Sequence, residues 1–226
     1  MGLAELLEIR PGVTAFIGGG GKTTLLRTLG EELAAVGRRV LLCASTKMVP
    51  FDGLPNLTDP TEMVLAAALE RHRLICAGSP VPGTGKLTAP PIPMARLVSL
   101  AEYVLVEADG SAGRPMKAHA PHEPVIPPEA NQTILVVGAS GFGRSIGEAA
   151  HRPERYAYLA GLPETAPVTP EVAAVVLRAE GLHDRIYVNQ VEAAGDWENA
   201  AALAGRLACP VLAGSLWRGE YRVCAQ

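Results

Sequence analysis

The sequence predicts an α/β protein with a mostly parallel β-sheet and helices on both faces. Along its 226 residues, short apolar runs that suit buried strands alternate with segments whose apolar residues recur at helical spacing. The first apolar run, residues 13–17, leads into four consecutive glycines, and a helical pattern begins at Leu25. This order of strand, glycine-rich loop and helix predicts a P-loop nucleotide-binding fold.

The loop residues have the chemistry that a nucleotide phosphate requires. Glycines let main-chain N–H groups face a closely approaching phosphate, and four of them are adjacent here: Gly18, Gly19, Gly20 and Gly21. Lys22 supplies a mobile positive charge for the β- and γ-phosphates, and Thr23 supplies a hydroxyl ligand for Mg²⁺. Thr24 follows in the first helical turn, where unpaired N–H groups and the helix dipole favour anions. The alternative is a glycine-rich turn that binds nothing.

One departure from the usual P-loop pattern narrows the subclass. Phe16 stands six residues before Lys22, where the usual loop has a glycine, and the loop reads Gly-Gly-x-Gly-Lys-Thr-Thr. It resembles the variant loop of the MinD and signal-recognition group of P-loop proteins. Many dimer-forming ATPases of that group have a second lysine five residues before the loop lysine. Ile17 occupies that position in this chain, which does not support an intersubunit lysine there.

Composition indicates one cytoplasmic domain over residues 1–226. The chain is 48% hydrophobic, which suits a single large core. The formal net charge is -3 without a long basic run, so nucleic acid is not an expected partner. No apolar run approaches membrane-spanning length, and the first ten residues do not read as a signal peptide. The four cysteines, which are Cys43, Cys76, Cys209 and Cys224, lie far apart in the sequence, and we expect them to be reduced thiols. We expect three of the four to lie in the core.

The second apolar run, residues 40–44, predicts a buried strand that ends in polar residues. Ser45, Thr46 and Lys47 follow it at the carboxyl end of a parallel strand, where α/β proteins bind ligands. We therefore expect Lys47 to contact the nucleotide, and a plain polar strand end is the alternative. Further on, the patterns predict a turn-rich connection at 51–60, a helix at 61–69, a strand at 73–77 and a helix at 95–101.

Residues 78–93 are rich in glycine and proline and predict a hairpin or a flexible flap. A second Gly-Lys pair, Gly85 and Lys86, lies inside this segment. It is not a second phosphate loop, because the prolines soon after Lys86 prevent a helix from starting there.

A second motif supplies carboxylates at the end of a buried strand. Residues 103–106 are apolar, and Glu107 and Asp109 follow them. Because side chains in a strand alternate, these two carboxylates share a side. Asp109 is the first choice for Mg²⁺, and Glu107 could orient a water or act as a base. The alternative is that one of the two caps the next segment.

The loop after Asp109 combines basic residues with several prolines. We expect Arg114 and Lys117 to face the terminal phosphate or an anionic acceptor, because the loop starts at the metal-binding carboxylate. His119 and His122 can be read as a metal pair, but a rigid proline-containing loop without a cysteine-rich partner is the better interpretation.

The last third of the chain repeats the alternation of strand and helix. The patterns predict a strand at 133–137, a helix from 170 to about 179, a strand at 185–188, a helix at 197–207 and a strand at 211–212. Thr169 and Pro170 form a strong helix start. Asn189, Gln190 and Glu192 look like a degenerate base-reading motif of GTPases, in which Asn189 would contact the nucleotide. A polar strand end explains them equally well.

The central loop also carries a resemblance to a known family. The stretch Glu-Ala-Asp-Gly-Ser-Ala-Gly-Arg-Pro-Met-Lys from Glu107 to Lys117, followed by His-Glu-Pro-Val-Ile-Pro, resembles the YqeC family. The glycine loop, Ser45-Thr46-Lys47, Gly138-Ala139-Ser140 and His151-Arg152-Pro153-Glu154 fit that family too. The resemblance implies an accessory protein linked to selenium-dependent molybdenum hydroxylases, with a maturation protein as a partner.

Together these features predict a protein that binds ATP or GTP with Mg²⁺ and hydrolyses the nucleotide or transfers its terminal phosphoryl group. In this interpretation Lys22 and the glycine N–H groups hold the phosphates, and Thr23 and Asp109 organise Mg²⁺. Two alternatives remain open. One is a nucleotide-gated binding module or chaperone with little turnover, and the other is a kinase or ligase that acts on an anionic small molecule.

Overall fold

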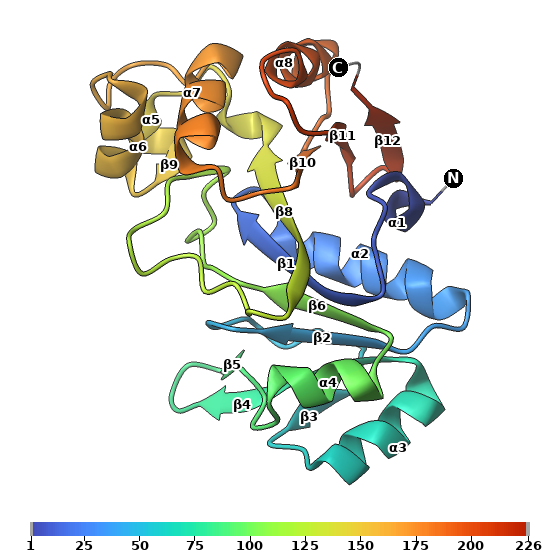
Figure 1. Ribbon diagram of the computed structural model, residues 1–226. Coiled ribbons are helices and arrows are strands. Elements are labelled where there is room, and N and C mark those ends of the chain that lie inside the picture. The colour runs from blue at the N-terminus through green and yellow to red at the C-terminus, as the bar shows by residue number, and fades with distance from the viewer. Residues whose placement is uncertain (1, 225–226) are drawn as a thin grey trace. The chain divides into compact units, whose positions relative to one another are not determined.

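The computed structural model describes residues 2–224, and the predicted single domain contains two compact units. The first unit comprises residues 2–16, Thr23–Gly110 and Val125–Gln132. The second comprises Ile17–Lys22, Ser111–Pro124 and residues 133–224. The chain therefore crosses between the units five times: before and after the glycine loop, on both sides of the loop that follows Asp109, and after Gln132. Figure 1 labels the elements of both units.

The first unit contains a parallel sheet whose order matches the α/β prediction. Its strands follow one another as β1 (Gly12–Gly18), β6 (Tyr103–Glu107), β2 (Val40–Ala44), β4 (Leu74–Val81) and β3 (Asn56–Thr58). Each neighbouring pair is parallel. Because parallel strands need crossovers, helices connect most of them: α2 (Lys22–Ala35), α3 (Glu62–His72) and α4 (Met94–Leu100).

Helices cover both faces of this sheet, as predicted. On one face, Leu65 and Leu69 of α3 and Leu97 of α4 pack with Leu41 and Val104 of the sheet in one buried cluster. Figure 1 shows α3 and α4 side by side next to β3 and β4. On the other face, α2 approaches closely at Gly30, where a Cβ would lie 2.8 Å from a methyl of Leu74 and 3.2 Å from one of Leu42.

Residues 78–93, where a hairpin or a flexible flap is expected, include the turn and second strand of a hairpin. Strand β4 runs on to Val81, turns, and pairs antiparallel with β5 (Lys86–Thr88). An isolated antiparallel bridge between Met48 and Leu87 ties β5 to the segment after β2. The predicted turn-rich connection at 51–60 contains the short strand β3, which the sequence pattern did not indicate.

The second unit contains strands in the order β12, β11, β10, β8, of which all but β12 run parallel. Their bounds are β8 (Ala130–Gly138), β10 (Arg185–Asn189), β11 (Val211–Ser215) and β12 (Glu220–Val223). Helices α6 (Pro153–Ala160), α7 (Pro170–Glu180) and α8 (Ala194–Ala204) accompany them. The predicted start of α7 is confirmed, because the Thr169 hydroxyl accepts a hydrogen bond from the N–H of Val172.

Several short elements complete the described chain. They are α1 (Leu3–Leu6), the 3₁₀ turn η1 (Ala139–Gly141), α5 (Ile146–Ala149), and a two-stranded parallel ladder of β7 (Met116–Lys117) and β9 (Ala150–His151). All four cysteines are free, and three of them are buried, as predicted: Cys43, Cys76 and Cys224. None of the helices within residues 2–224 is long and apolar enough to cross a membrane.

Candidate functional site

The glycine loop between β1 and α2 has a backbone that only glycine tolerates. Gly20 and Gly21 have positive φ angles of 77° and 114°. A Cβ on Gly20 would lie 2.4 Å from the main-chain nitrogen of Gly138, and one on Gly21 would lie 2.6 Å from the side-chain nitrogen of Asn189. The run of glycines therefore follows from close packing inside the second unit as well as from any ligand.

Two of the glycine N–H groups are used within the protein. The N–H of Gly19 donates to the carbonyl of Val136 at 2.9 Å, and that of Gly20 donates to the carbonyl of Arg114 at 3.1 Å. The phosphate contacts expected from glycine amides therefore shift toward the start of α2, which begins at Lys22. The first N–H groups of any helix have no partner within the helix, so this end suits an anion.

The loop lysine, Lys22, is 4% exposed. Its ammonium donates to the carbonyl of Gly18 at 2.5 Å, four residues back in the same loop. The contact folds the side chain back over the loop, and contact of Lys22 with a phosphate stays a prediction.

Asn189, at the end of β10, forms a hydrogen bond with the glycine loop. Its side-chain N–H donates to the carbonyl of Gly20 at 2.7 Å, and its side-chain oxygen accepts the N–H of Leu216 at 3.2 Å. The amide thus joins the glycine loop to the segment after β11 within the second unit. Direct contact of Asn189 with a base stays a prediction.

The neighbours of Asn189 in the degenerate base-reading motif bind other side chains. Gln190 accepts a hydrogen bond from the Ser140 hydroxyl at 2.6 Å. Glu192 accepts one from the Ser215 hydroxyl at 2.6 Å and pairs with Arg218 at 2.7 Å. These contacts join the strand ends of the second unit to one another.

In the first unit, Thr23 and Glu107 form the hydrogen bond that defines the candidate metal site. The Thr23 hydroxyl donates to a carboxylate oxygen of Glu107 at 2.8 Å. The register of the sheet places Glu107 for this contact with Thr23, because Glu107 ends β6 opposite Phe16 of β1 and Ala44 of β2. Glu107 is 7% exposed, and Asp109, two residues further, is fully buried.

The sequence favours Asp109 as the Mg²⁺ ligand, and the carboxylate that contacts the Thr23 hydroxyl is that of Glu107. The pairing depends on where β6 stops relative to β1, which the period-two pattern cannot show. A fully buried Asp109 beside this pair keeps its predicted role open.

Within the second unit, the loop after Asp109 is held by a group of charges that consists of the buried Lys117 and the half-buried Glu123 and Arg152. Lys117 pairs with Glu123 at 3.1 Å, and Arg152 pairs with the other Glu123 oxygen at 2.9 Å. Burial alone would raise the pKa of Glu123, but hydrogen bonds from Arg152 and Lys117 outweigh it and lower the pKa to about 2. The carboxylate therefore stays charged and fixes the loop.

The remaining basic residues of this loop also contact the second unit. The Arg114 guanidinium donates to the carbonyl of Glu148. His119 is 2% exposed, and its Nδ1 lies 2.9 Å from a carboxylate oxygen of Glu180 at the end of α7, while its main-chain N–H donates to the other oxygen. Contact of Arg114 or Lys117 with a phosphate stays a prediction.

Lys47 lines a pocket of about 440 Å³ in the first unit. We call it the two-lysine pocket, because it is lined by Ser45, Thr46, Lys47, Lys86, Thr88 and Gly110. The sequence predicts a nucleotide contact for Lys47 but none for Lys86 or Thr88. The scarcity of lysine in the chain is a signal for Lys86, and no sequence pattern marks Thr88.

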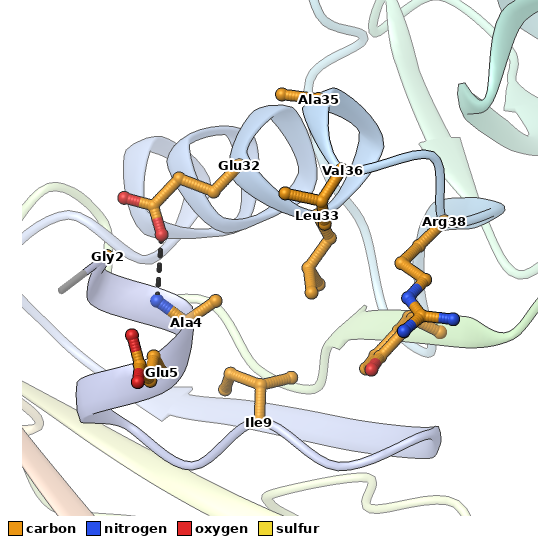
Figure 2. A pocket seen from close by; sticks show the side chains of 10 residues that line it. Gly2, Ala4, Glu5, Ile9, Glu32, Leu33, Ala35, Val36 and Arg38 are labelled. Atoms are coloured by element: carbon orange, nitrogen blue, oxygen red, sulfur yellow. Dashed lines mark hydrogen bonds between the residues drawn. The ribbon is translucent and has the colours of Figure 1, made fainter.

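A second pocket, of about 530 Å³, lies between α1 and α2 in the same unit (Figure 2). Tyr103, which begins β6, is among its lining residues, so it sits at the opposite end of that strand from Glu107. Two of its three charged residues make protein contacts: Glu32 accepts the main-chain N–H groups of Leu3 and Ala4, and Arg38 pairs with Glu102. The candidate metal site, in contrast, lies at the carboxyl end of β6.

The strand, glycine loop and helix, with the loop threonine bonded to a carboxylate at the end of a parallel strand, define a P-loop NTPase-like protein. A family model described as YqeC protein matches residues 14–154. "Uncharacterized protein YqeC" of Escherichia coli (strain K12) is 36% identical over 180 residues, covering 76% of this chain and 70% of that protein. The chain belongs to the YqeC family, as the resemblance in the central loop predicted.

Among solved structures, the hydrogenase maturation factor HypB from Archaeoglobus fulgidus aligns with a TM-score of 0.44. The two chains are 12% identical, and the alignment covers 95% of this chain and 86% of that one.

Proposed function

We propose that this protein binds ATP or GTP together with Mg²⁺ and hydrolyses the nucleotide or transfers its terminal phosphoryl group. The observation that supports the proposal most strongly is the hydrogen bond of 2.8 Å between Thr23 and Glu107. A loop hydroxyl and an acidic strand end are the pair that holds Mg²⁺ in P-loop NTPases. A structural turn has no need of this pair.

The donor set fits Mg²⁺. The ion prefers oxygen ligands in octahedral geometry at about 2.0–2.1 Å, which puts neighbouring ligand oxygens about 2.9 Å apart. The oxygens of Thr23 and Glu107 are 2.8 Å apart, and the carboxylate brings the negative charge that a divalent cation needs. Thr23 and Glu107 would hold Mg²⁺, which would supply positive charge to neutralise the negative charge that develops during phosphoryl transfer. Asp109 is the proposed second carboxylate, acting directly or through a water.

The protein's own groups would hold the nucleotide around this ion. Lys22 and Thr23 are consecutive residues at the start of α2, so the loop lysine and the metal-binding threonine belong to one short segment. We propose that the ammonium leaves the Gly18 carbonyl for the β- and γ-phosphates. The first N–H groups of α2, including those of Thr23 and Thr24, would donate to the same oxygens. Asn189 would keep the loop in this shape.

The accessory role in maturing a selenium/molybdenum hydroxylase is part of the proposal and rests on the family resemblance. We propose two roles for Arg114 and Lys117. They stabilise the loop after Asp109, and they contact a terminal phosphate. Their observed partners, the Glu148 carbonyl and the Glu123 carboxylate, support the steadying role.

A panel of ATP, GTP and CTP with and without Mg²⁺, followed by product analysis, tests the proposal. We expect nucleoside diphosphate to form from ATP or GTP only with Mg²⁺, and Thr23→Ala to remove this turnover. Thr28→Ala is the matched control, because that hydroxyl bonds the carbonyl of Thr24 one turn along the same helix. Binding without any product would favour the nucleotide-gated module, and neither binding nor product would refute the proposal.

A further inference from the structure

The two-lysine pocket adjoins the candidate metal site within the first unit. The main-chain N–H of Ser45, one of its lining residues, donates to the carbonyl of Glu107 at 3.1 Å. Gly110, another lining residue, directly follows Asp109. A ligand in this pocket would therefore lie beside both carboxylates that the proposed function assigns to Mg²⁺.

The backbone around the pocket explains why both lysines face it. Main-chain hydrogen bonds of 2.8 and 2.9 Å join Met48 and Leu87 in an antiparallel bridge. Both side chains point into the core and are 2% and 3% exposed. Because side chains alternate along extended chain, Lys47 on one segment and Lys86 and Thr88 on the other share the opposite face. The hairpin of β4 and β5 thus delivers a cation to the pocket.

Lysine is scarce in this chain, and its positions coincide with the candidate chemistry. Of the 20 lysine and arginine residues only four are lysines: Lys22, Lys47, Lys86 and Lys117. Lys22 belongs to the glycine loop, and the buried Lys117 pairs with Glu123. The other two both line this pocket, although every other basic residue is arginine. Lysine is a compact point charge that commonly binds phosphate.

The Ser45 hydroxyl of the pocket donates to the carbonyl of Val125, but other polar groups of the pocket have no partner in the described chain. Within residues 2–224, no carboxylate pairs with the ammonium of Lys47 or Lys86. The side-chain oxygen of Thr46 is buried and has no hydrogen-bond partner in the same part of the chain. Two like charges on one face repel each other, and a buried hydroxyl without a partner is costly. An anion that accepts hydrogen bonds would relieve both.

We propose that the two-lysine pocket binds the phosphate or carboxylate group of a second small molecule, distinct from the nucleotide. Lys47 and Lys86 supply the charge, and the hydroxyls of Thr46 and Thr88 supply hydrogen bonds. This inference rests on the proposed function, because the pocket's location makes its occupant the substrate that accompanies the nucleotide. It names that substrate's class, an anionic small molecule, and the residues that recognise it.

Site-resolved NMR titration of the full chain tests the proposal. Inorganic phosphate and succinate are added separately at constant ionic strength, balanced with chloride, while amide signals of the pocket and of residues 18–22 are followed. The titration is repeated with Lys22→Ala, which weakens any phosphate site at the glycine loop, and with Lys86→Gln. Arg71→Gln on α3 is the control for loss of one exposed positive charge in the same unit.

We expect the pocket amides to shift in a saturable way with at least one probe, in the wild-type protein, in Lys22→Ala and in Arg71→Gln. Lys86→Gln should weaken this binding about tenfold, the effect of losing one charge-assisted hydrogen bond. The probe that saturates at the lower concentration identifies phosphate or carboxylate as the recognised group. Shifts no larger than those with chloride, or equal affinity in Lys86→Gln, would overturn the inference.

The same spectra separate this inference from the proposed function. If Mg²⁺-nucleotide leaves the signals of residues 18–22 unchanged, the nucleotide proposal fails whatever the pocket does. If those signals respond but the pocket amides do not saturate with either probe, only the second-ligand proposal fails.

Discussion

The hydroxyl of Thr23 and the carboxylate of Glu107 are the two groups on which the proposed chemistry depends most. Glu107→Gln keeps the shape and a hydrogen-bond acceptor but removes the negative charge that a divalent cation requires. We expect it to weaken Mg²⁺-dependent nucleotide binding by about tenfold or more, with little change in binding measured in EDTA. Asp109→Asn, measured in the same way, shows whether the second carboxylate shares the role.

Glu102→Gln is the matched control for Glu107→Gln. Glu102 directly precedes β6, at the other end of the strand from Glu107, and pairs with Arg38 and Arg39 on the surface. An exposed ion pair of this kind contributes about 0–1 kcal/mol, so Mg²⁺-dependent affinity should stay unchanged. Equal Mg²⁺ titration curves for Glu107→Gln and wild type would remove Glu107 from the metal site.

Asn189 is expected to act through the glycine loop. Asn189→Ala removes the hydrogen bonds to Gly20 and from Leu216, so the free energy of unfolding should fall by about 1–3 kcal/mol. Nucleotide affinity should fall as well, because the loop loses its support. Asn131→Ala is the control, since its exposed amide donates to the carbonyl of Pro11. A stable Asn189→Ala protein with wild-type affinity would contradict this supporting role.

For single residues, the sequence predicts the site best where the predicted role depends on neighbouring residues in the chain. Lys22 and Thr23 follow from their place directly after a glycine run, and the structure places them at the start of α2. The choice between Glu107 and Asp109 depends on sheet register, which is a tertiary property. Asn189 was ambiguous for the same reason, because its partners lie far away in sequence at Gly20 and Leu216.

Among the elements, the loop Ser111–Pro124 depends on the charged group around Glu123. The pKa of Glu123 is about 2 in the folded protein, below its ordinary 4.5. A lowered carboxyl pKa adds stability above pH 4.5, and this stability is lost as the pH falls from about 4.5 toward 2. Thermal unfolding measured across that range should therefore show a steep acid loss, and Glu123→Gln should flatten it.

Glu62→Gln serves as the control for Glu123→Gln. Glu62 pairs with Arg96 on the surface, where solvent screens the interaction. Its acid profile should follow the wild-type profile closely. If Glu123→Gln and wild type lose stability in parallel between pH 4.5 and 2, Glu123 does not hold the loop.

The elements that sequence reasoning missed share a physical cause. Strand β12 has exposed residues in three of its four positions and a half-buried Tyr221, so it lacks an apolar run. Strand β3 has only three residues, two of them exposed. Helices α5 and α6 have four and eight residues, too few for a clear helical period. The long, strongly patterned elements β1, α2, β6 and α7 were all predicted.

For the whole molecule, the main feature is that the predicted single domain contains two compact units, and that Lys22 and Thr23 fall on either side of the division. Composition gave no sign of it, because neither a linker nor a change of residue usage marks the crossing points. The division follows from contacts, whereas the overall α/β class follows from the alternation of strands and helices.

A Mg²⁺-nucleotide that binds only the folded chain should raise the protein's unfolding temperature, and the increase should grow with the nucleotide concentration.

The most direct test of the central claim is calorimetric titration of ATP and GTP, each with Mg²⁺, into wild-type protein and Lys22→Ala. We predict saturable binding of at least one nucleotide to the wild type and a loss of about tenfold or more in Lys22→Ala, whose fold circular dichroism should show to be intact. Equal affinity of both proteins, or no binding of either nucleotide to the wild type, would contradict the assignment of the glycine loop to a nucleotide phosphate.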